Sequence, residues 1–144
     1  MLLTTKFIPV VMCLALSAAT ALHAQERMRT GMWESTVTAA SGQSATHSSC
    51  FKPEDAAKSN GPAAAARSET EKEMSKSGCT LKDFNLDGNT LNMTMVCAGN
   101  ATHQETKFHG GESFETTMTS TMNGVTRVTQ IKGRRTGDCK AAAE

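Results

Sequence analysis

The chain lacks the short motifs that most often mark an enzyme or a metal site. No serine of the 144-residue sequence lies in a Gly-x-Ser-x-Gly motif, so nothing indicates a hydrolase with that nucleophile. No two cysteines have the Cys-x-x-Cys spacing, which argues against a zinc or iron–sulfur site. Repeats with a long period are also absent. We therefore predict a protein that is not an enzyme and that carries no cofactor.

An excess of charge of either sign is absent as well. The sequence has 15 basic and 14 acidic residues, and Lys6 is the only charged residue before Glu26. Removal of the first 24 residues would therefore leave 14 residues of each sign. This balance gives no electrostatic basis for binding nucleic acid or an anionic membrane surface.

Residues 1–24 have the pattern of a cleavable export signal. The apolar run 7–22 is too short, and too quickly followed by polar sequence, for a membrane-spanning helix. Ala24 is a small residue before a plausible cleavage site, and a cut after Ala21 or a retained anchor are the alternatives. The sequence thus predicts a periplasmic or secreted protein of a Gram-negative bacterium, without a transmembrane segment after cleavage. Residues 25–144 are predicted to form a single domain.

An even number of cysteines remains once the signal is removed. They are Cys50, Cys79, Cys97 and Cys139. In a small exported chain, four cysteines indicate two disulfides, which can pair in three ways.

The segment between the second and third of these cysteines selects one pairing. Asp87–Asn89 separates two alternating stretches, and its glycine and asparagine tolerate the positive φ that hairpin loops need. A three-residue loop places Leu86 opposite Thr90, and the same register places Cys79 opposite Cys97. Opposed Cβ atoms approach within about 4.5–5.5 Å, which suits a disulfide. The sequence predicts this disulfide and, consequently, one between the remaining two cysteines.

Alternation of apolar and polar residues predicts further strands. A first strand is expected over 31–39, and the polar stretch 41–49 is interpreted as a loop. Later strands are expected over 102–108, 113–122 and 125–135, with a tight hairpin at the Asn-Gly pair before Val125.

The residues between the first strand and Cys79 have the composition of helices. Pro53, followed by two acidic residues, is typical of a helix start. The low-complexity segment 58–77 is poor in bulky apolar residues, which predicts a surface helix from about Ala63 to Ser77 or a mobile insertion. We therefore predict a mainly β (α+β) fold: an antiparallel meander of about six strands, curved or closed into a partial barrel. One or two helices would be inserted after the first strand, and two disulfides would hold the domain.

Four stretches resemble landmarks of a known family. They are MRTGMWE from Met28, CFKPEDA from Cys50, FHGGESFETTM from Phe108 and GRRTGDC from Gly133. Their order is similar to that in small exported bacterial proteins catalogued as domain of unknown function 3617. Met32 stands where leucine is usual in that family, and Lys52 stands where threonine is usual. Since the family has no assigned activity, the resemblance implies a fold and a compartment rather than a chemistry.

Methionines and the few aromatic residues are the side chains best suited to an apolar binding surface. Methionines share strand faces in the predicted hairpins, a pattern that fits either core filling or contact with ligands of varied shape. The chain has no tyrosine, so its single tryptophan is either a core anchor or one wall of a pocket. An arginine near the last cysteine is a candidate anion ligand or one half of an ion pair. The candidate binding residues are Trp33, Met93, Met95, Phe114, Met118 and Arg134.

These observations leave three functions open. The first is a non-enzymatic binding module of the cell envelope for an apolar or lipid-like ligand. The alternative is a structural or protein-interaction domain that contacts an envelope protein through an exposed sheet edge or the charged insertion. The third is a copper-binding protein that combines methionines with His47, His103 and His109.

Overall fold

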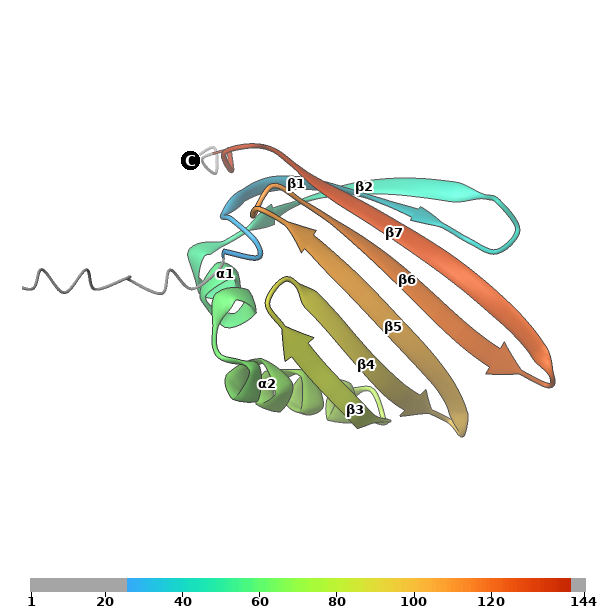
Figure 1. Cartoon of the computed structure of the whole chain (residues 1–144). Coiled ribbons are helices and arrows are strands. Elements are labelled where there is room, and N and C mark those ends of the chain that lie inside the picture. The colour runs from blue at the N-terminus through green and yellow to red at the C-terminus, as the bar shows by residue number, and fades with distance from the viewer. Residues whose placement is uncertain (1–25, 141–144) are drawn as a thin grey trace, which may run out of the picture.

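Seven strands form one antiparallel sheet in the computed structural model, which describes residues 26–140 (Figure 1). The strands are β1 (Gly31–Thr38), β2 (Ser44–Phe51), β3 (Cys79–Asp87), β4 (Thr90–Cys97), β5 (Asn100–His109), β6 (Ser113–Met122) and β7 (Val125–Gly137). Two helices, α1 (Pro53–Asn60) and α2 (Ala63–Lys76), connect β2 to β3. The strand order β2-β1-β7-β6-β5-β4-β3 brings the last strand back beside the first, and the sheet does not close. This confirms the predicted mainly β, antiparallel class.

The predicted signal peptide, residues 1–24, lies outside the described residues. Within residues 26–140, neither helix has the length and apolar character needed to cross a membrane.

Strand β2 is the element that the sequence interpretation missed, because the stretch 41–49 was interpreted as a polar loop. β2 lies at the edge of the sheet and pairs only with β1, so its residues from Ser44 to Cys50 are all exposed. A strand exposed in this way needs no apolar alternation. Backbone pairing with β1 holds it instead, and cross-strand hydroxyl pairs accompany that pairing, with Thr36 Oγ1 and Thr46 Oγ1 2.9 Å apart. The helices therefore follow the second strand of the sheet.

Both helices begin where the sequence indicates. α1 starts at Pro53, and the backbone N–H of Lys52 donates to Asp55 Oδ2 at 3.4 Å, a capping interaction across the first turn. α2 ends one residue before the predicted boundary and buries none of its side chains. It packs against β3. The low-complexity segment is thus helical, although it contributes little to the core.

The β3–β4 hairpin confirms the predicted disulfide but corrects the register near its turn. Leu86 faces Leu91 rather than Thr90, because the turn has two residues, and Gly88 takes φ +54°. A β-bulge between Leu81 and Asp83 adds one residue to β3. The bulge restores the register at the other end of the hairpin, so Cys79 still pairs with Cys97.

The two predicted disulfides hold opposite ends of the sheet. Cys50–Cys139 joins the end of β2 to the residues after β7, with Cα atoms 5.4 Å apart. Cys79–Cys97 joins the first residue of β3 to the last residue of β4, with Cα atoms 4.3 Å apart.

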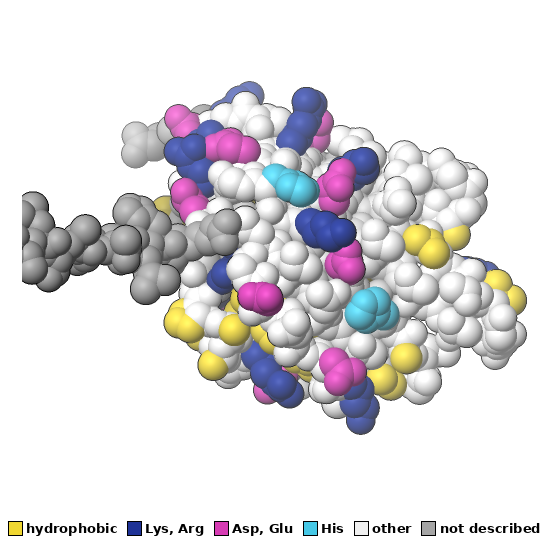
Figure 2. Space-filling view, viewed as in Figure 1, with side chains coloured by type: hydrophobic (Ala, Val, Ile, Leu, Met, Phe, Trp, Pro, Cys, Tyr) yellow, Lys and Arg dark blue, Asp and Glu magenta, His cyan; other side chains and the backbone are white. Residues whose placement is uncertain are grey.

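Strand register divides the side chains of the sheet between two faces. The inner face, on the side of α2, carries the apolar residues Trp33, Phe51, Leu81, Phe84, Leu86, Leu91, Met93, Met95, Phe108, Phe114, Met118 and Ile131. The outer face carries exposed ion pairs such as Lys132–Glu115 and Lys107–Glu105. Figure 2 shows this face, over which basic and acidic side chains lie interspersed with histidine.

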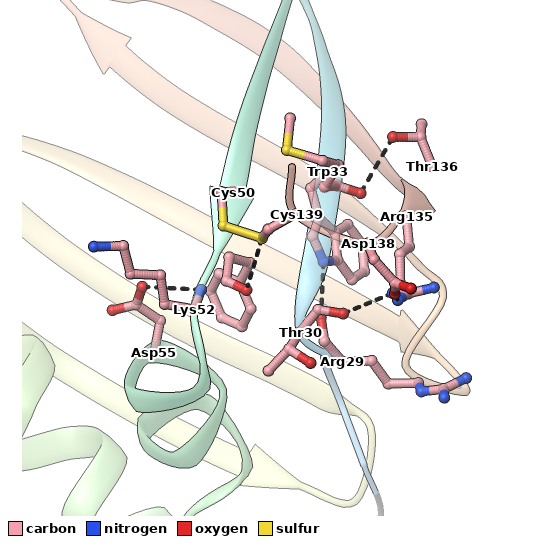
Figure 3. Close-up of a disulfide and its surroundings, with 12 residues drawn as sticks. Arg29, Thr30, Trp33, Cys50, Lys52, Asp55, Arg135, Thr136, Asp138 and Cys139 are labelled. Carbon is pink, nitrogen blue, oxygen red and sulfur yellow. Dashed lines mark hydrogen bonds and ion pairs between the residues drawn. A yellow bond between two sulfur atoms is a disulfide. The ribbon is translucent and has the colours of Figure 1, made fainter. Parts of the chain in front are cut away.

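An aromatic cluster at one end of the inner face contains the most buried side chain. Trp33 is 3% exposed, and its ring centroid lies 5.8 Å from that of Phe114 and 6.4 Å from that of Phe51. Its Nε1 donates to the carbonyl of Arg29 at 2.8 Å (Figure 3). The Cys50–Cys139 disulfide and the Arg135 side chain, which donates to the carbonyl of Thr30 at 2.7 Å, lie close by (Figure 3). This end of the sheet therefore holds the aromatic part of the core, and Leu81 and Met93, each 8% exposed, continue the core along the inner face.

Candidate functional site

A cavity of about 200 Å³ lies between the two helices and strands β3–β5, on the inner face of the sheet. The sheet contributes four apolar side chains: Phe84, Leu86, Leu91 and Phe108. The helices and the N-terminal segment contribute Lys58, Ser59, Ala66, Glu69, Thr70 and Arg27. The floor of the cavity is thus apolar, and its charged side chains come from the elements that cover it.

The cavity exists because α2 faces the sheet with small side chains. Ala66 and Thr70 are one helical turn apart on the lining side, and the Thr70 hydroxyl donates to the Ala66 carbonyl at 2.8 Å. Neither residue is long enough to fill the space above Leu91 and Phe108. Since protein interiors are normally close-packed, an unfilled apolar space of this size suits a ligand.

Arg27 is a buried cation in the wall of this cavity. The residue is 8% exposed, and its guanidinium donates to three backbone carbonyls: Ser59 at 2.8 Å, Gly61 at 2.6 Å and Gly88 at 3.4 Å. Asn60 fixes the backbone beside it, because Asn60 Oδ1 accepts from the N–H of Arg27 at 2.7 Å and from that of Met28 at 3.0 Å. The arginine therefore connects the N-terminal segment, the end of α1 and the β3–β4 turn.

The other charges of the cavity neutralise each other. Lys58 Nζ lies 3.1 Å from Glu69 Oε1, and the hydrogen bond that it donates to Glu69 raises the pKa of Lys58 above its ordinary value. Burial lowers the pKa of Arg27, but a guanidinium stays protonated in proteins even so. No carboxylate of residues 26–140 lies within ion-pair distance of Arg27. The cavity wall thus carries one positive charge without a counter-ion among the described side chains.

The residues predicted from the sequence lie elsewhere on the sheet. Trp33 and Phe114 meet in the aromatic cluster, and Met93 and Met118 flank Gln104 in one row across β4, β5 and β6. Met95 faces Leu81 on the same inner face. Arg134 alone points to the outer face, where its Nη2 lies 2.7 Å from Glu34 Oε1. The lining of the cavity includes none of these six candidate residues.

The sequence-based candidates did not include the residues that line the cavity, and these residues are of two kinds. Phe84, Leu86 and Leu91 carried a usable signal, since they occupy one face of a hairpin that the sequence does predict. Arg27 carried no signal of its own. Its burial depends on Asn60 and Gly88, which are 33 and 61 residues away.

The copper alternative finds no support in this arrangement. His103 and His109 lie on the outer face of β5, whereas the methionines of β4 and β6 lie on the inner face. His47 lies on the exposed edge strand β2, separated from β5 by β1, β7 and β6. All four cysteines of the described chain are in disulfides. Within residues 26–140, no group of three or more His, Cys, Asp or Glu side chains gathers as a metal site.

Comparison with known proteins gives a family but no relative of known activity. A family model described as "Protein of unknown function (DUF3617)" matches residues 28–139. Neither the curated proteins nor the solved structures gave a significant match to the chain. The matched residues run from the segment beside Arg27 to the last cysteine, and so cover all seven strands and both helices. The chain therefore belongs to the DUF3617 family.

Proposed function

We propose that the protein is a non-enzymatic binding module of the bacterial cell envelope, which takes an apolar or lipid-like ligand into the cavity beneath α2. The observation that carries this proposal is the apolar cavity itself, lined by Phe84, Leu86, Leu91 and Phe108. The cavity, at about 200 Å³, is somewhat larger than an engineered apolar cavity of about 150 Å³ that binds benzene. It is smaller than the roughly 300–1,000 Å³ of drug-sized sites, so the ligand is a short alkyl chain or a small ring system.

The proposed compartment is supported by the disulfides and by the predicted export signal. Disulfides persist in oxidising compartments such as the periplasm. Fractionation of cells that express the full chain tests this part of the proposal. We expect the mature protein in the periplasmic fraction with Gln25 as its first residue. Recovery of full-length protein from the cytoplasm, with free thiols, would contradict it.

Binding is tested by titrating the exported protein with 1-aminonaphthalene, an uncharged apolar probe whose fluorescence rises in apolar surroundings. Each buried methylene contributes about 0.8 kcal/mol, so a ligand of this size binds weakly, with a dissociation constant of roughly 0.1 mM. We expect saturable binding and displacement by 1-octanol.

A pair of matched variants on α2 locates the site. Ala66→Phe places a ring in the cavity, whereas Ala64→Phe adds the same ring at an exposed position on the same helix. We expect A66F to abolish probe binding and A64F to retain it, with both variants folded by circular dichroism. Unchanged binding by A66F would exclude the cavity as the binding site.

An interaction domain is the second candidate, favoured by the exposed edge of the sheet. β2 pairs with β1 along one side only, and its residues from Ser44 to Cys50 are exposed. Such an edge can accept an additional strand from a partner protein. Thr46→Pro on this edge separates the two candidates. It would weaken a partner that adds a strand there, but it would leave the probe titration unchanged.

A further inference from the structure

We propose that the ligand of this cavity is an amphipathic carboxylate, such as a medium-chain fatty acid anion, and that Arg27 is its counter-ion. This inference rests on the proposed function and adds the charge and class of the ligand. The juxtaposition that carries it is a buried guanidinium at the border of an apolar cavity that contains no other unneutralised charge among the described residues.

The guanidinium of Arg27 has N–H groups that donate to no acceptor among the described residues. It carries five N–H groups, of which one on each nitrogen donates to a carbonyl of Ser59, Gly61 or Gly88. The contact to Gly88 is long, at 3.4 Å. One N–H on each terminal nitrogen finds no acceptor among residues 26–140. Each of these free N–H groups can donate a charge-assisted hydrogen bond to a carboxylate oxygen.

The protein itself compensates only part of the positive charge of Arg27. The carbonyls of Ser59 and Gly61 lie at the carboxyl end of α1, where the helix dipole is equivalent to roughly half a negative charge. This favours the arginine at that position, but it leaves the remaining charge buried. A buried charge is normally paired, and the only carboxylate in the cavity lining, Glu69, is paired with Lys58.

A polar atom in the β3–β4 turn, next to Arg27, also lacks a hydrogen-bond partner. Asn89 follows Gly88 in the β3–β4 turn, and its Oδ1 is buried without a hydrogen-bond donor from the described chain. The turn whose Gly88 carbonyl accepts from Arg27 therefore carries a buried acceptor without a donor. A carboxylate accepts from the free N–H groups of Arg27, whereas a wholly apolar ligand leaves them unpaired.

The shape of the cavity then selects the rest of the ligand. Phe84, Leu86, Leu91 and Phe108 form an apolar wall of limited volume, which suits an alkyl chain of about eight carbons. With its carboxylate on Arg27, such a chain lies between α2 and the sheet.

Calorimetric titration of the full exported protein with octanoate and with 1-octanol tests the inference. The two ligands share the alkyl chain and differ in charge. We expect octanoate to bind at least about tenfold more tightly than 1-octanol, and octylamine to bind more weakly than either, because its cation meets Arg27.

Two matched arginine variants assign the effect to one side chain. Arg27→Gln should reduce octanoate affinity about tenfold more than it reduces 1-aminonaphthalene affinity, because only octanoate carries a charge that pairs with the guanidinium. Arg29→Gln, in the same segment, removes an exposed side chain that pairs with Glu112 and should leave both affinities unchanged. Should R27Q not fold, the three-ligand series on the wild-type protein still decides the question.

The outcomes separate this inference from the function on which it rests. Equal affinities for octanoate and 1-octanol, or an unchanged octanoate affinity in R27Q, would overturn the role of Arg27 and leave a neutral apolar site. Failure of 1-aminonaphthalene and of all three octyl ligands to bind would overturn both proposals. An octanoate preference that is lost equally in R29Q would also overturn the assignment, since it would indicate general surface charge.

Discussion

The two ends of the sheet are built from the same strands but differ in what covers them. At the closed end, the N-terminal segment, α1, the β3–β4 turn and the Cys50–Cys139 disulfide gather around Trp33 and Arg27, which are 3% and 8% exposed. At the open end, the tips of the β1–β2 and β6–β7 hairpins extend away from both helices (Figure 1). Met122 and Val125 at the second tip are 46% and 56% exposed.

This difference shows that strand pattern alone does not determine burial in this fold. Strand β6 alternates in the same way along its whole length, yet Phe114 lies in the aromatic cluster at one end and Met122 is exposed at the other. The elements outside the sheet make the core, and the cavity lies where their cover is incomplete. Stability and ligand binding are therefore both expected to depend on the closed end.

The largest expected effect concerns the two disulfides, one at each end. In the chain-entropy model, removal of Cys50–Cys139, which spans 89 residues, costs about 4–5 kcal/mol, against about 3 kcal/mol for Cys79–Cys97, which spans 18. Urea unfolding of the two double Cys→Ala variants measures this. A larger loss for the open-end pair would mean that the open end contributes more to stability than its exposure indicates.

Substitution of one apolar residue at each end tests the comparison directly. Trp33→Ala removes the most buried side chain and should cost about 3–5 kcal/mol, because it leaves a cavity between Phe51 and Phe114. Val125→Ala at the open end should change the unfolding free energy by less than about 0.5 kcal/mol. Circular dichroism must follow the unfolding, since Trp33 is the only tryptophan. Similar costs at both ends would refute the comparison.

The features that the sequence predicted correctly depend on local chemistry. The Asn123–Gly124 turn has φ of +51° and +76° at its two residues, which asparagine and glycine tolerate. The disulfide pairing followed from the hairpin pattern, and it survived an error of one residue at the turn because the bulge in β3 compensates for it. Strand β2 was missed because an exposed edge strand has no apolar side to reveal it.

The candidate site was harder to predict, because it depends on contacts between distant segments. The predicted candidates were the conspicuous aromatic and methionine side chains, and five of the six do lie on the inner face. The cavity, however, results from small residues of α2, which leave space, and from Arg27, whose carbonyl partners come from the end of α1 and from the β3–β4 turn. Neither small residues in a surface helix nor one arginine near the N-terminus stands out in a sequence.

A smaller effect is expected where Phe114 crosses Gly133 at the closed end. The two residues are directly opposed on β6 and β7, and a Cβ at Gly133 would collide with the phenylalanine ring. Gly133→Ala should therefore cost about 1–3 kcal/mol. In a Phe114→Ala background the same change should be nearly neutral, because the ring is gone. A double-mutant cycle by urea unfolding measures this coupling, and additive costs would contradict the steric explanation.

The smallest expected effect is on the outer face, at the ion pair between Arg134 and Glu34. The Arg134 side chain is 69% exposed, so Arg134→Gln should change the free energy of unfolding by less than about 1 kcal/mol. Because Arg134 and the cavity lie on opposite faces, R134Q should also leave octanoate affinity unchanged, in contrast to R27Q. The two variants remove the same charge from the same protein and differ only in which face loses it. An equal drop in octanoate affinity in R134Q and R27Q would therefore show that binding depends on the net charge of the protein. The cavity at the closed end would then not be the octanoate site.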